Sequence, residues 1–199
     1  MLAGLGAALY TSGFSEDAAS RLCEASDLDP SLSAPYLFLG KIQEAASGPL
    51  PCAEQKLARF ASQKLGDALA NYYYAIALWK RDRGAKTSES LAKVEALLQK
   101  SATIDPTFDL ASLQLGTIYF EQEDIPKALA AYQKAVAANP AGCEAHYKLG
   151  LTYKRLGDEV NAQQEFKEYK KLDQTETATI ERQRREVKQF LFVLQDQAK

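Results

Sequence analysis

The sequence predicts an all-α fold, an α–α superhelix of about five helix–turn–helix repeats followed by a C-terminal capping helix. Two observations predict the repeats. A Leu-Gly dipeptide recurs at intervals of 34, 76 and 34 residues, and a fixed period of this length is typical of stacked helical repeats. Prolines recur after the second helices, where they stop one helix and precede the next. The dipeptides begin at Leu5, Leu39, Leu115 and Leu149, and the prolines are Pro30, Pro106 and Pro140.

Residues 1–32, 109–142 and 143–174 carry the repeat most completely. In each, apolar residues spaced i, i+3 and i+7 surround the Leu-Gly pair, which places them on one face of a first helix. Small alanines and further apolar residues follow on a second helix. The shared positions are Leu2, Leu9, Gly13, Ala18, Leu22 and Ala25; Ser112, Tyr119, Ala128, Tyr132 and Ala135; and His146, Tyr153, Gly157, Ala162, Phe166 and Tyr169. This spacing resembles the tetratricopeptide repeat, and the resemblance implies a curved array of helical hairpins.

The glycines of the repeat fall inside predicted helices, where each costs about 1 kcal/mol relative to alanine. A sequence that repeats this cost indicates a contact too close for a side chain. The glycines are Gly6, Gly40, Gly116 and Gly150, and the second-helix alanines predicted to face the same contact are Ala18, Ala128 and Ala162.

Residues 33–66 and 67–108 form two irregular repeats, because the 76-residue interval exceeds two periods. Tyr72–Trp79 is predicted to be the first helix of the second of these, with either Ile76-Ala77 or Ala75-Ile76 in place of Leu-Gly. The extra residues are expected in two turns of loop composition, which a repeat array tolerates. These turns are Ser47–Pro51 and Gly84–Ser88.

Residues 175–199 are predicted to form an amphipathic capping helix over the open end of the array. Its apolar face is expected to hold Ile180, Val187, Leu191 and Leu194, with Phe190 beside them and charged residues elsewhere. A cap needs only one face, so Phe192 and Val193 are an alternative start of a partner or dimer contact.

Composition argues against nucleic-acid binding and against a membrane-spanning segment. The chain has 199 residues and a net charge of −2, which gives no basic footprint for nucleic acid. No apolar stretch reaches the ~18 residues of a membrane-spanning helix. The first helix begins almost at Met1, which suggests a fragment of a longer protein. Three cysteines, Cys23, Cys52 and Cys143, are expected to be unpaired thiols, which fit the cytoplasm better; a removed upstream signal would instead allow the periplasm.

No catalytic or metal-binding motif is recognised, so the sequence predicts a protein that is not an enzyme and needs no cofactor or metal. His146 is the only histidine and occupies a packing position of the repeat. Cys143 lies three residues before it, but two candidate ligands cannot complete a tetrahedral metal site. The pair also lacks a third group to orient a nucleophile.

The resemblance implies that the first helices line a concave surface, and that residues one, five and eight or nine beyond the bulky repeat position point into it. The lining is apolar and aromatic, with cations at its edge. The predicted partner-binding residues are Tyr10, Lys41, Tyr73 (or Tyr74), Lys80, Leu113, Thr117, Phe120, Tyr147, Leu151, Lys154 and Arg155. Family members that clamp a peptide's terminal carboxylate place lysine, arginine and asparagine here. This chain departs from that pattern, which disfavours such a clamp.

The leading hypothesis is therefore a protein-interaction module whose groove holds a peptide segment of a partner. One alternative is self-association, for example as a homodimer through the C-terminal helix. Another is a recruiting or regulatory region of a larger multidomain protein.

Overall fold

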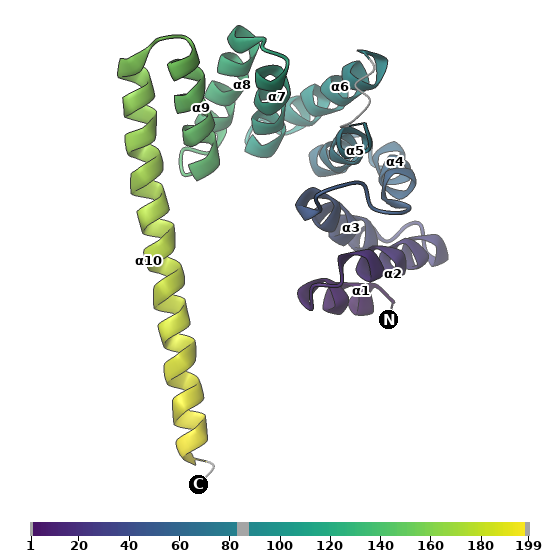
Figure 1. The fold of residues 1–199 in the computed structure, drawn as a ribbon. Coiled ribbons are helices and arrows are strands. Elements are labelled where there is room, and N and C mark those ends of the chain that lie inside the picture. Colours follow the sequence, from purple (N-terminus) through teal and green to yellow (C-terminus); the bar gives the residue numbers. More distant parts are fainter. Residues whose placement is uncertain (1, 83–87, 198–199) are drawn as a thin grey trace. The chain divides into compact units, whose positions relative to one another are not determined.

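The computed structural model describes residues 2–82 and 88–197, and the side chains in these ranges other than those of 88, 183, 184 and 186–197. Within the two ranges it contains ten helices and no strand (Figure 1), so the all-α prediction is confirmed. The helices are α1 (Leu2–Thr11), α2 (Ser15–Leu28), α3 (Ser33–Ala45), α4 (Ala53–Gln63), α5 (Ala68–Arg81), α6 (Ser88–Ile104), α7 (Asp109–Glu121), α8 (Ile125–Ala138), α9 (Cys143–Arg155) and α10 (Glu159–Gln197).

The chain divides into two compact units, Met1–Leu115 and Gly116–Lys199, with the division inside α7. In the first unit, hairpin partners α1 and α2, α3 and α4, and α5 and α6 pack against each other, and α3 also packs against α2 and α5. In the second unit, α9 lies between α8 and α10 and packs against both. Helices α3 and α9 thus each contact their own hairpin partner and a helix of the preceding repeat.

Turns within the three regular hairpins, α1–α2, α7–α8 and α9–α10, share one backbone feature. Gly13, Glu123 and Gly157 have φ of 87°, 62° and 78°, in the left-handed region that favours glycine. Each lies seven residues after the glycine of its Leu-Gly pair. The repeat therefore fixes the geometry of the turn even where glutamate replaces glycine.

Turns between repeats are held by the residue that precedes the proline. Asp29 Oδ1 accepts hydrogen bonds from the backbone N–H and the hydroxyl of Ser31, at 3.0 and 2.6 Å. Asp105 accepts the same two bonds from Thr107, at 2.9 and 2.7 Å. These side-chain turns stop one helix and set the direction of the next.

The predicted close approach at the repeat glycines is confirmed. A Cβ added to Gly116 would lie 2.5 Å from the Tyr132 ring, and one added to Gly150 would lie 2.8 Å from Phe166. Gly40 differs, because its neighbour at 2.1 Å is Tyr73 of α5 rather than a residue of its own hairpin partner α4.

The irregular spacing of the second and third repeats arises from extra residues between their helices. Helix α5 contains the predicted Tyr72–Trp79, and Ala75, Ile76 and Ala77 are all buried, so either register points small or apolar residues inward. Residues 46–52 form the loop between α3 and α4, as the turn composition predicts. Of the second predicted turn, residues 84–87 lie outside the described residues, and Ser88 begins α6.

The C-terminal segment differs from the expected separate cap. Helix α10 runs without a break across the predicted boundary at 174–175, and within the second unit it extends well past the end of α9 (Figure 1). Residues 173–182 are exposed, and Ile180 keeps 42% of its surface. The predicted inward residues Val187, Phe190, Leu191 and Leu194, and the alternative Phe192 and Val193, lie outside the described side chains.

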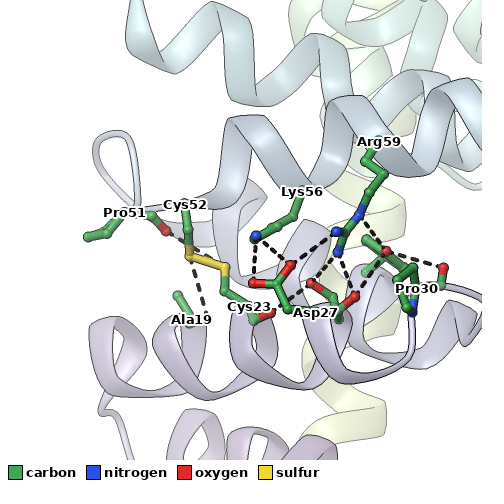
Figure 2. Close-up of polar contacts among 10 residues, drawn as sticks. Ala19, Cys23, Asp27, Pro30, Pro51, Cys52, Lys56 and Arg59 are labelled. Carbon is green, nitrogen blue, oxygen red and sulfur yellow. Dashed lines mark hydrogen bonds and ion pairs between the residues drawn. A yellow bond between two sulfur atoms is a disulfide. The ribbon is translucent and has the colours of Figure 1, made fainter.

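The prediction of three unpaired thiols is wrong for two of them. Cys23 of α2 and Cys52, which directly precedes α4, form a disulfide with their Cα atoms 6.4 Å apart (Figure 2). Cys143 is a half-buried free thiol. The pairing depends on how α2 and α4 lie side by side and on the path of the 46–52 loop, neither of which the cysteine spacing reveals.

Candidate partner-binding surface

The second unit places three predicted residues in one row on α9. Tyr147, Leu151 and Lys154 are spaced i, i+4 and i+7, so they share one helical face. Tyr147 is 40% exposed, Leu151 is half-buried and Lys154 is exposed. This α9 row offers an aromatic ring, an aliphatic side chain and a cation in sequence along one helix of 13 residues.

The ring of Tyr147 packs against two aromatic rings of α10. Its centroid lies 6.0 Å from that of Phe166 and 5.2 Å from that of Tyr169, with the rings tilted by 52° and 48°. Such tilted aromatic pairs are favourable and limit the freedom of the rings. Tyr147 is thus both exposed and held in place.

Other predicted residues of the second unit lie on α7 or at the end of α9. Thr117 is half-buried and its hydroxyl accepts a hydrogen bond from Tyr132, at 3.3 Å. Phe120 is half-buried. Arg155 is exposed and pairs with Glu123 at 3.1 Å, an exposed ion pair of small energy.

In the first unit the predicted residues have different environments. Tyr10 and Leu113 are half-buried, and Lys41 is exposed. Tyr73 is only 2% exposed, and burial raises the pKa of its phenol to about 12. Its ring fills the space above Gly40, so it serves helix packing and leaves almost no surface to a partner. The alternative Tyr74 is half-buried, with the Lys93 ammonium 5.1 Å from its ring centroid.

Lys80, predicted as an edge cation, belongs to α5, and its ammonium lies at the C-terminal end of α3. Its ammonium donates hydrogen bonds to the backbone carbonyl of Glu44, at 2.5 Å, and to that of Ala46. A cation at this end is stabilised by the helix dipole and satisfies carbonyls that have no partner within the helix. Lys80 therefore fixes the start of the 46–52 loop.

A polar network that the sequence did not indicate joins α2, α3 and α4 (Figure 2). Asp27 accepts hydrogen bonds from Lys56, at 2.7 Å, and from Arg59, at 3.0 Å. The hydrogen bond from Lys56 is the main cause that lowers the pKa of Asp27 below its usual value. Arg59 also donates to the Ser26 carbonyl, at 2.5 Å, and to the Tyr36 hydroxyl, at 2.9 Å. Lysine, arginine and aspartate this far apart in sequence gave no recognisable spacing.

A second feature missed from the sequence is a pocket of about 470 Å³ in the first unit. It lies where the 46–52 loop meets α4 and α5, and Cys52 of the disulfide forms part of its wall. The lining residues are Gln43, Pro49, Leu50, Cys52, Glu54, Gln55, Ala77 and Arg81.

The only histidine of the sequence is engaged in structural contacts. His146 is 7% exposed and lies between the Glu165 carboxylate and the Pro140 carbonyl, at 2.6 and 3.1 Å. In the described ranges, no three acidic, cysteine or histidine side chains come close enough to hold a metal ion. No helix in the part of the chain that the structure describes is both long enough and apolar enough to cross a membrane.

Comparisons with known proteins agree with this architecture. A family model described as a TPR repeat matches residues 116–157. Curated protein sequences give no match. Among solved structures, MamA is similar with a TM-score of 0.65 and 22% identity, over 87% of this chain and 96% of that one.

Two further solved structures are similar. A thermophilic TPR protein of Thermus thermophilus gives a TM-score of 0.66 at 18% identity, over 84% of this chain and 88% of that one. The pilF protein of Pseudomonas aeruginosa gives 0.67 at 16% identity, over 85% and 74%. Proteins built from this repeat are generally non-enzymatic scaffolds for protein interactions. Residues 116–157 are tetratricopeptide-repeat sequence, and the chain has the tetratricopeptide-repeat fold.

Proposed function

We propose that the chain is a protein-interaction module whose second unit binds a peptide segment of a partner along the α9 row of Tyr147, Leu151 and Lys154. One observation carries this proposal. Tyr147 keeps 40% of its surface exposed while Phe166 and Tyr169 hold its ring from behind. An aromatic side chain that is already ordered loses little entropy when a partner covers it, and such residues dominate binding energy at interfaces.

The chemistry of the row defines the segment that it would take. Tyr147 and Leu151 offer apolar contact area, while the exposed Lys154 ammonium lies one turn beyond Leu151. A complementary segment carries apolar side chains followed by an aspartate or glutamate that reaches Lys154. Thr117 and Phe120 of α7, both half-buried, would extend the same contact within the second unit.

A library of displayed peptides, selected on the full chain, tests this proposal. We expect enriched peptides to share apolar residues next to an acidic one, and to lose binding to Tyr147→Ala and to Lys154→Glu. Lys170→Glu is the matched control, because it also reverses an exposed charge, on α10. Circular dichroism checks that each variant folds. Peptides that bind both row variants as well as the parent would exclude this surface.

Self-association through α10 is a second candidate, favoured by the length of that helix. Helix α10 has 39 residues whereas its partner α9 has 13, and residues 173–182 of α10 are exposed. The sequence beyond them continues the apolar spacing of Ile180 with Val187, Leu191 and Leu194. Sedimentation of the full chain and of a variant ending at Gln189 tests it. A chain that stays monomeric at high concentration contradicts this candidate.

We also propose that the chain performs no catalysis of its own. His146, the only histidine, is enclosed by its two structural contacts and is 7% exposed. The surface that remains is suited to recognition by shape, apolar contact and a few charges. The net charge of −2 supports a protein partner over a nucleic acid.

A further inference from the structure

We propose that the Cys23–Cys52 disulfide is a site of reversible thiol–disulfide exchange, attacked at the Cys52 sulfur by a thiolate that enters the neighbouring pocket. The disulfide and the pocket both belong to the first unit, whereas the α9 row belongs to the second. The pocket therefore takes no part in the proposed partner-binding surface.

The two sulfurs differ in access. Cys23 lies in the middle of α2 and is 5% exposed, so a reductant has little room to approach it. Cys52 is half-buried and forms part of the wall of the pocket of about 470 Å³. Pockets of this volume commonly hold small molecules, so a thiol of tripeptide size fits. Access decides which sulfur of a disulfide is attacked.

The loop that carries Cys52 is held by bonds that do not depend on the disulfide. The Gln43 amide donates to the Gly48 carbonyl, at 3.0 Å, and accepts from the Leu50 N–H, at 2.9 Å. Gln43 is itself 1% exposed, so these bonds are shielded from water. Lys80 holds the Ala46 carbonyl. Residues 46, 48 and 50 therefore keep their places when the sulfurs separate.

The contact between α2 and α4 is also held by bonds other than the disulfide (Figure 2). Asp27 bonds both Lys56 and Arg59, and Arg59 reaches the Ser26 carbonyl as well. The helices thus stay together after reduction, and the two thiols remain near enough to pair again. The disulfide can therefore be reduced and formed again without unfolding of the first unit, as reversible exchange requires.

The exchange takes place in two steps. A thiolate of a dithiol forms a bond to Cys52 Sγ, the bond between the two cysteine sulfurs breaks, and Cys23 leaves with the electron pair and takes a proton from water. The second thiol of the reductant then attacks the mixed disulfide, which releases Cys52 as a thiol. The dithiol is oxidised by two electrons and the cystine is reduced. The oxidised dithiol drives the same steps in reverse.

Mapping of the mixed disulfide tests the site of attack. The full chain carrying Cys143→Ser, which removes the other thiol, is treated without denaturant with reduced glutathione or with dithiothreitol, then acid-quenched, alkylated and peptide-mapped. We expect glutathione on Cys52 and the alkylating group on Cys23, with unchanged circular dichroism. Dithiothreitol, whose second thiol resolves the intermediate, should leave both cysteines alkylated. Adducts on Cys23, or reduction that occurs only in urea, would overturn the proposal.

A matched pair of substitutions tests the role of the pocket. Gln55→Trp places a bulky ring at the pocket wall from an exposed position of α4, and Gln63→Trp places the same ring on α4 outside the pocket. We expect the first to slow reduction by glutathione several-fold and the second to leave the rate unchanged. Equal rates in both variants would contradict entry through the pocket.

Discussion

The imidazole of His146 in α9 lies 2.6 Å from the carboxylate of Glu165 in α10, between ring Nδ1 and Oε2. On its other side, Nε2 donates to the carbonyl of Pro140, at 3.1 Å, because a carbonyl oxygen can only accept. His146 therefore ties the second helix of its repeat to the turn that precedes the first. Tyr36 makes a similar contact in the first unit, where its hydroxyl donates to the Pro30 carbonyl at 3.3 Å. Both carbonyls lie six residues before the ring.

Replacement of His146 by phenylalanine should destabilise the second unit by about 1–3 kcal/mol. The ring keeps its volume, but the Glu165 carboxylate and the Pro140 carbonyl lose their partner, and unpaired polar groups cost this much when largely buried. Urea unfolding followed by circular dichroism measures the change. Glu165→Gln retains a hydrogen-bonding group and should cost less. Equal stability of His146→Phe and the parent chain would show that the contacts contribute nothing net.

The glycine contacts predict opposite effects of the same substitution at two positions. In Gly40→Ala, the new Cβ meets the buried Tyr73 ring at 2.1 Å, so we expect a loss of about 1–3 kcal/mol from overpacking. In Gly4→Ala, no atom of the described residues lies within 4 Å of the new Cβ, so the better helix propensity should stabilise α1 by up to about 1 kcal/mol. Thermal melting of both variants measures the difference. Similar melting temperatures would contradict the packing role of Gly40.

Glu123 occupies the left-handed turn position that glycine fills at Gly13 and Gly157. Glu123→Gly should therefore stabilise the second unit by about 1 kcal/mol, because a side chain in this region is disfavoured by roughly that amount. The substitution also removes the exposed pair with Arg155. Glu123→Ala removes the same pair but keeps a Cβ, so it serves as the control. A glycine variant no more stable than the alanine variant would be inconsistent with the turn geometry.

Two buried tyrosines should lose their phenol protons only at a pH above the usual range. Burial is the main cause that raises the pKa of both Tyr73 and Tyr132 from 10.0 to about 12. Since the folded state favours the neutral phenol, this stabilisation is complete below pH 10 and is lost as the pH rises through 12. Near-ultraviolet absorbance of phenolate follows the titration. Tyr73→Phe and Tyr132→Phe should each remove one group from the step near pH 12, and an unchanged step would contradict the assignment.

The repeat positions and the packing of their glycines were predictable because they depend on local spacing. Leu-Gly pairs place glycine on the helix face that meets Tyr132 or Phe166, and the helical period suffices to find that face. The α5 helix was found in the same way, although its exact register was not. Because the same spacing recurs in several repeats, the register of one repeat can be checked against the others.

Features that depend on how helices of different repeats lie against each other were not predictable. The pairing of Cys23 with Cys52 and the network of Asp27, Lys56 and Arg59 both require the position of α4, which follows the irregular 46–52 loop. The repeat spacing predicts Tyr73 on the concave surface, yet its side chain packs on Gly40 of another helix. One-dimensional spacing does not contain this information.

Site-specific photo-cross-linking tests the central proposal, that the α9 row holds a partner segment. A photoreactive phenylalanine is introduced at Leu151, in the row, or at Leu156, which follows α9 and is 49% exposed, and each chain is irradiated with a peptide selected as above. We expect a cross-link from position 151 that Lys154→Glu abolishes, and none from position 156. Cross-linking from 156 alone, or from neither position with a peptide that binds, would contradict the proposed surface.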